Sequence, residues 1–240
     1  MTENNSFLKG IKDGLPICIG YFAVSFAFGI TAVGLGLTWL EALLISMTNL
    51  TSAGQLAGVP IIAGGGSLIE MAVSQLVINS RYALMSVTLS QKLGKSIKLP
   101  HKFLISFGNT DEIFAVAQTG KHHVGKKYMY GLILMPYIGW SLGTLLGAVA
   151  DNILPAIIIS ALGVAIYGMF VAIVVPVAKK QKNVLFCVLV AIFLSCLFKY
   201  MSVLNTVPDG FVIIICAVIA SMVFSFVSPI PVKEDGEEND

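Results

Sequence analysis

SLIEMAVSQLVINSRYALMSVTLS, residues 67–90, decides the fold class of this chain. The stretch is apolar enough to lie in lipid, yet it carries Glu70, Gln75, Asn79 and Arg81, and Arg81 is the only arginine in the sequence. A charged side chain at membrane depth costs ~3 kcal/mol on insertion scales, so such residues usually face protein or a water-filled cavity and serve function. The stretch therefore predicts a membrane-spanning helix with a functional polar face.

The composition of the whole chain agrees with a membrane protein. Of its 240 residues, 56% are hydrophobic and 12% are charged, whereas a soluble domain has about 25% charged residues. Several uncharged runs exceed the ~20 residues that a spanning helix needs, and they are continuously apolar instead of alternating, which favours helices over membrane strands. The lysines are scattered in short loops, so the net charge of +2 does not indicate a nucleic-acid partner.

We expect an all-α integral membrane protein with about six transmembrane helices. The expected spans are residues 14–37, 67–90, 128–149, 153–178, 184–201 and 210–227. They form a single transporter domain over residues 1–228, followed by an acidic, disordered tail at 229–240. The polar start leads directly into a full-length span, which predicts no cleavable signal peptide.

The first expected span carries two local signals. Pro16 falls in its first turn, where a missing N–H costs little. A stripe of mostly small residues favours close packing against another helix. The stripe consists of Tyr21, Ser25, Gly29, Ala32 and Gly36.

Two further hydrophobic segments are predicted to be broken or re-entrant. Residues 40–66 have a polar, glycine-rich centre between apolar halves, which predicts irregular backbone there. At membrane depth, irregular backbone is tolerated only where it lies against protein or lines a cavity. A kinked ordinary helix is the alternative. Residues 103–120 lie between two lysine-rich loops and carry Asn109 to Glu112 at their centre. This second segment either dips into the membrane and returns, or lies at the interface as a helix capped by Thr110.

The lysines also predict the orientation. If residues 40–66 return to the side they came from, the basic loops at 92–102, 121–127 and 179–182 all lie on one side, which the positive-inside rule makes cytoplasmic. The opposite connections carry acidic residues and no lysine. Both termini are then cytoplasmic.

Glu70 and Arg81 share a face of the same predicted helix, eleven residues apart. At 1.5 Å per residue their separation is ~16 Å, so they cannot pair with each other within this helix. Each charged side chain therefore needs another partner.

The sequence contains no recognisable motif of an enzyme active site. All three histidines lie in lysine-rich loops, and no metalloprotease, phosphate-binding or dinucleotide motif occurs. We expect no catalytic residue, no metal and no cofactor.

A transporter fits better, because broken helices near the membrane centre bind substrates and coupling ions. For a zwitterion, Arg81 or a helix N-terminus can take a carboxylate, and Asp111 or Glu112 can take an ammonium group or a proton.

Four blocks in sequence order resemble the AzlC family of branched-chain amino acid permeases. They are LPICIGYFAVSFAFG at 15–29, SAGQLAG at 52–58, NSRYALMSVTLS at 79–90 and TDEIFAVA at 110–117. The resemblance implies a multi-pass protein of the bacterial plasma membrane that exports leucine, isoleucine, valine and, in some members, methionine, driven by the proton gradient. It also implies a small hydrophobic AzlD-type membrane partner.

The candidate site residues follow from their polarity at membrane depth and from these blocks. The substrate-binding candidates are Asn49, Ser52, Gly54, Gln55, Asn79, Arg81 and Tyr82, and the proton-coupling candidates are Glu70, Asp111 and Glu112. Ser52 stands where many family members have Phe, and Ser80 stands where Leu is commoner. Two other functions stay open: a passive channel for a small polar solute, and an accessory or assembly subunit of a membrane complex.

Overall fold

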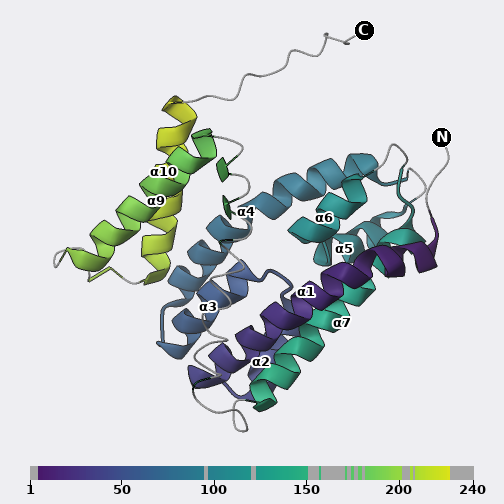
Figure 1. The fold of residues 1–240 in the computed structure, drawn as a ribbon, viewed down its shortest axis with the longest axis horizontal. Helices are drawn as coiled ribbons and strands as arrows, with labels where there is room; N and C mark the ends of the chain where they lie inside the picture. Colours follow the sequence, from purple (N-terminus) through teal and green to yellow (C-terminus); the bar gives the residue numbers. More distant parts are fainter. Residues whose placement is uncertain are drawn as a thin grey trace. The chain divides into compact units, whose positions relative to one another are not determined.

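The computed structural model describes residues 5–94, 97–119, 123–150, 182–201, 206–207 and 209–227, with isolated positions between 157 and 179. These residues form helices and no strand, which confirms the all-α prediction. The chain folds as two units, residues 1–169 and 170–240 (Figure 1). The predicted acidic tail and nearly all of the span expected at 153–178 lie outside the described residues.

Within the described part of the chain, three helices are long and apolar enough to cross a membrane. They are α1 (Phe7–Gly34), α7 (Lys126–Ala150) and α9 (Lys182–Tyr200). The stretch that decided the fold class is α4 (Leu68–Lys92), whose 25 residues are long enough but whose polar side chains leave it outside that group. It is confirmed as a helix, and its role as a span stays a prediction. In the second unit, α9 packs against α10 (Asp209–Val227).

Helices α1 and α7 lie side by side in parallel (Figure 1). A Cβ atom added at Gly10 or Gly29 of α1, or at Gly131 or Gly147 of α7, would lie 2.0–2.3 Å from a backbone oxygen of the other helix. Only glycine allows the two backbones to approach this closely. The predicted small-residue packing face is therefore confirmed for Gly29, along with its buried neighbours Ser25 and Ala32.

Two expectations about α1 were wrong. The helix begins at Phe7 because Ser6 caps it by accepting a hydrogen bond from the Lys9 N–H at 3.3 Å, so Pro16 lies inside the helix and not in its first turn. Gly36 does not join the packing face: it follows the helix end with φ +99°, and a Cβ atom there would have nothing within 4 Å. Its positive φ supplies the turn into the next helix.

Both segments that were expected to be broken are broken. Residues 40–66 form α2 (Trp39–Thr48) and α3 (Ala53–Ala63), and residues 103–120 fall in α5 (Leu99–Phe107) and α6 (Asp111–Gln118). A capping box between Thr38 and Glu41 starts α2, in the pattern that satisfies two helix-end donors at once. We call residues 49–52 the first break and residues 108–110 the second break.

The end of α4 and the residues just before α7 meet on one side of the first unit. The Gly94 N–H donates to the Val124 oxygen at 3.0 Å, and the Val124 N–H donates to the Lys92 oxygen at 3.1 Å. The side chain of Asn5 accepts from the Lys127 N–H at 2.8 Å, which brings the start of α1 to the same place. The segment between α4 and α7 therefore returns to the side it left, as expected; the cytoplasmic placement of this side stays a prediction.

Candidate functional site

Helix α4 brings its polar face to both breaks of the first unit. Gln75 and Asn79 reach the first break, whereas Arg81 and Ser86 reach the second. These side chains follow one another along a single helix, so α4 contacts both irregular regions. Such irregular backbone in a membrane protein is where transporters bind their substrates.

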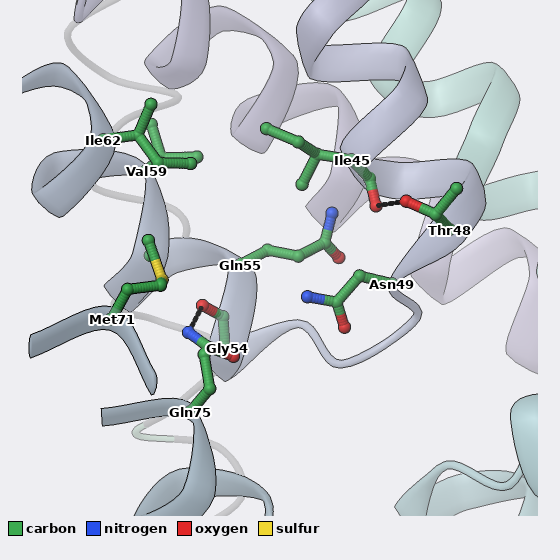
Figure 2. Close-up of a pocket in the computed structure, with 10 residues that line it drawn as sticks. Ile45, Thr48, Asn49, Gly54, Gln55, Val59, Ile62, Met71 and Gln75 are labelled. Carbon is green, nitrogen blue, oxygen red and sulfur yellow. Dashed lines mark hydrogen bonds between the residues drawn. The ribbon is translucent and has the colours of Figure 1, made fainter. Parts of the chain in front are cut away.

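A pocket of about 190 Å³ opens at the first break between α2, α3 and α4. Figure 2 shows the side chains around it. One end is polar, where the first turn of α3 meets the break, and the other end is apolar. The lining consists of Ile45, Thr48, Asn49, Gly54, Gln55, Gly58, Val59, Ile62, Met71 and Gln75.

Because Gly54 has no side chain, two side chains of α4 can approach the backbone next to the first break. Its carbonyl oxygen accepts a hydrogen bond from Gln75 Nε2 at 2.8 Å, and Gln75 Oε1 accepts one from Asn79 Nδ2 at 3.0 Å. A Cβ atom at Gly54 would lie 2.5 Å from Thr51 Oγ1, 2.7 Å from Gln75 Oε1 and 3.1 Å from Asn79 Nδ2. The position therefore excludes any larger residue unless this amide network moves.

Gln55 is the most buried amide of the pocket, with 1% of its surface exposed. Its Nε2 donates to Ser46 Oγ at 2.9 Å, and Ser46 Oγ lies 2.7 Å from Thr144 Oγ1 of α7. Its Oε1 is buried and has no hydrogen-bond partner among the residues that the structure describes. Leaving a buried acceptor unsatisfied costs ~1–3 kcal/mol, which makes this oxygen a candidate contact for a donor.

Ser52, at the end of the first break, adopts an unusual backbone conformation. Its φ of +46° lies in the left-handed region that favours glycine. As the N-cap residue of α3 it makes no side-chain hydrogen bond to the helix, and its buried Oγ has no partner within the described part of the chain. Strained backbone of this kind costs about 1–3 kcal/mol and clusters at binding sites. The first turn of α3 is thus left without a side-chain cap.

The second break carries charges instead of amides. Arg81 Nη1 lies 2.7 Å from Asp111 Oδ2, and both side chains are 46% exposed. Arg81 Nη2 also donates to the Tyr82 hydroxyl at 3.4 Å. Both partners are half exposed on the surface of the protein, so each can be reached by another group.

Glu112 lies next to this ion pair but has a different partner. The Tyr21 hydroxyl of α1 donates to the Glu112 carboxylate and lies 2.7 Å from Thr110 Oγ1. The Tyr21 ring packs edge-on against Trp140 of α7, with 5.3 Å between the ring centroids. Thr110 also accepts from the Ile113 N–H at 3.5 Å, which confirms its predicted role as the cap of α6.

The candidate residues thus fall into two groups. Asn49, Ser52, Gly54, Gln55 and Asn79 gather at the first break, and Arg81, Tyr82, Asp111 and Glu112 gather at the second.

Glu70 stands apart from both groups. It lies in the first turn of α4, where its N–H donates to Ser67 Oγ at 3.1 Å, and it is 6% exposed. As expected, Arg81 finds its partner outside its own helix.

Several contributors were not among the site candidates drawn from the sequence. Ser46 and Met71 lie in apolar runs and give no local signal, because their roles depend on which helices meet. Gln75 could have been included from its place on the polar stripe of α4, and Tyr21 from its place on the packing face of α1.

Comparison with known proteins gives consistent results. The sequence model of the family described as "AzlC protein" matches residues 16–154, which include both breaks and α4. "Inner membrane protein YgaZ" of Escherichia coli K12 is 30% identical over 195 residues, covering 78% of each chain. An "Uncharacterized membrane protein" of Archaeoglobus fulgidus is 32% identical over 181 residues, covering 75% of this chain and 79% of the relative. No solved structure matches significantly.

Proposed function

Since this chain belongs to the AzlC family of membrane proteins, we propose that it is the large subunit of an exporter of branched-chain amino acids. Its substrates are leucine, isoleucine, valine and methionine. It works in the bacterial plasma membrane with a small AzlD-type membrane partner and uses the proton gradient.

The observation that carries this proposal is the pocket at the first break. An amino acid with an aliphatic side chain needs polar contacts at one end and apolar contacts at the other, and the pocket has both within about 190 Å³. An engineered cavity of ~150 Å³ binds benzene, which has six heavy atoms. The pocket volume therefore suits a solute of the size of leucine better than a large metabolite.

The second break supplies the coupling chemistry in this proposal. Asp111 and Glu112 are carboxylates that each have one exchangeable partner, namely Arg81 and Tyr21. A proton that binds Asp111 weakens its attraction for Arg81, and the freed Arg81 then moves with α4, which also carries Gln75 and Asn79. Glu70 is a third candidate carboxylate at the far end of the same helix.

The test measures efflux of radiolabelled leucine from preloaded bacterial cells. The cells express this chain with a small AzlD-type membrane protein, and the comparisons are empty cells and an Arg81→Ala variant present at equal level. We expect faster efflux from the wild type, abolished by an uncoupler and by the substitution.

The other two functions give different outcomes. A passive channel gives efflux that does not saturate and does not respond to the uncoupler. An accessory subunit gives transport that survives substitution of Arg81 and Glu70 as long as the subunits still associate. Efflux no faster than from empty cells, with both subunits in the membrane, contradicts leucine export.

A further inference from the structure

We propose that the pocket at the first break holds the amino acid in one defined orientation. The carboxylate lies at the N-terminus of α3, the ammonium group donates to Gln55 Oε1, and the side chain packs against Val59, Ile62 and Met71. This inference rests on the proposed function for the class of substrate, and it assigns the binding contacts within that function.

The N-terminus of α3 provides the contact for the carboxylate. The first-turn N–H groups of a helix have no partner within the helix, and its dipole attracts negative charge. In α3 the Gly54 N–H donates to the Thr51 carbonyl oxygen at 3.2 Å, so the Ala53 and Gln55 N–H groups are the donors proposed for the carboxylate. Helix α3 has 11 residues, and its N-cap residue Ser52 provides no side-chain cap.

Gln55 independently indicates a ligand at this end of the pocket. Its amide is almost fully buried, has one partner for its nitrogen and none for its oxygen, and reaches across the pocket toward Asn49 (Figure 2). The Ser46–Thr144 contact fixes the amide from behind, so the oxygen is held in place before the ligand arrives. An ammonium group is a strong donor for such an oxygen, and hydrogen bonds to charged groups are the stronger class.

The opposite end of the pocket selects the side chain. Gly54 and Gln55 lie at the start of α3, whereas Val59 and Ile62 lie one and two turns further along the same helix. Met71 of α4 lies beside Val59 and Ile62 at this end of the pocket (Figure 2), and its sulfur would lie 3.5 Å from a Cβ atom at Gly58 of α3. Because a methionine side chain adapts to different shapes, this end accepts branched and unbranched apolar side chains of similar volume.

Binding is tested by substrate protection of a cysteine, which does not depend on transport. In a chain whose four native cysteines are replaced by alanine, Thr48→Cys serves as the reporter. Thr48 lines the pocket, and its hydroxyl donates to Leu44 O and Ile45 O of its own helix. The control is Thr88→Cys, since Thr88 is also exposed, also bonds its own helix at Leu84 O, and does not line the pocket.

The measurement is the rate of maleimide labelling in membranes that contain the complex. We expect leucine to slow the labelling of Thr48→Cys several-fold and to leave Thr88→Cys unaffected. Leucinamide lacks the carboxylate and 4-methylpentanoate lacks the ammonium group, so each should need about tenfold more ligand for half-protection, or higher. Equal protection by either analogue overturns the assignment of the group that it lacks.

A second pair of variants tests Gln55 directly. Gln55→Leu keeps the volume and removes the acceptor, so half-protection by leucine should require about tenfold more ligand. The matched control is Gln118→Leu, because Gln118 also has a buried amide atom without a partner but lies on α6, outside the pocket. The same loss in both variants means that the effect is general, which contradicts the proposed contact.

The outcomes separate this inference from the proposed function. Leucine efflux without protection at Thr48→Cys leaves the export function standing and overturns the binding site. Protection without efflux supports the site and overturns export of leucine. The absence of both overturns both.

Discussion

The two breaks of the first unit are both short irregular segments between helices, but one is surrounded by uncharged side chains and the other by charged ones. The first break is lined by uncharged amides, hydroxyls and apolar side chains, and its central amide is 1% exposed. The second break carries an ion pair whose side chains are 46% exposed, beside a carboxylate held by a tyrosine. Preorganised neutral groups favour selective binding, whereas half-exposed charged groups can exchange one partner for another. Helix α4 contacts both and can transmit changes between them.

The strongest way to break this comparison is to fill the first break. Gly54→Val places branched carbons where a Cβ atom alone would meet Thr51 Oγ1 at 2.5 Å, so the network with Gln75 and Asn79 must move. We expect leucine efflux to fall to the level of empty cells while the protein remains in the membrane. Gly20→Val is the control, because a Cβ atom at Gly20 has nothing within 4 Å. Normal efflux from Gly54→Val contradicts the role of this pocket.

The next effect separates coupling from binding at the second break. Asp111→Asn removes the charge that Arg81 contacts, so we expect efflux to lose its response to an uncoupler while leucine still protects Thr48→Cys within about twofold. If protection disappears together with coupling, the two breaks do not divide these tasks.

The contact between Tyr21 and Glu112 is expected to affect the stability of the protein more than its transport activity. Tyr21→Phe removes one hydroxyl that bonds Glu112 and Thr110, and a single hydrogen bond to a charged group contributes ~1.5–3 kcal/mol. A double-mutant cycle with Glu112→Gln, measured by thermal unfolding of the purified complex, should give a clear interaction energy. Strictly additive effects would mean that this contact does not hold α6 to α1.

The smallest effect is expected at Glu41, which lies in neither break. Hydrogen bonds from the Thr38 backbone and hydroxyl hold the pKa of the Glu41 carboxyl below its ordinary value of 4.5. The carboxylate therefore adds stability above about pH 4.5, and this stability is lost as the pH falls through the lowered pKa. Glu41→Gln should lower the melting temperature slightly at pH 7, equal the wild type in strong acid, and leave efflux unchanged. Changed efflux would show that the breaks are not the whole functional region.

Much of this arrangement could be predicted from local sequence. The glycine-rich polar centre of residues 40–66 and the Thr110 cap gave both breaks, because turn and cap residues act on their immediate neighbours. The eleven-residue separation of Glu70 and Arg81 correctly excluded their pairing.

What failed or was missed depends on tertiary contacts. That Asp111 pairs with Arg81, and Glu112 with Tyr21, follows from how α6 sits against α4 and α1. The start of α1 was placed too late, at residue 14, because the residues before it are polar. Ser6 caps the helix earlier, so α1 includes several of these polar residues. Ser46 and Met71 acquire their roles only when α2 and α4 meet α3.

The glycine contacts between α1 and α7 divide the first unit into a fixed part and parts that are free to move. A Cβ atom at any of seven glycines along this pair would lie within 3.0 Å of an atom of the other helix, so the two backbones pack closely along most of their length. These glycines are Gly10, Gly14 and Gly29 of α1 and Gly131, Gly139, Gly143 and Gly147 of α7. In the proposed transporter, this closely packed pair would stay fixed, and access to the pocket would change by movement of α2, α3 and α4 relative to it.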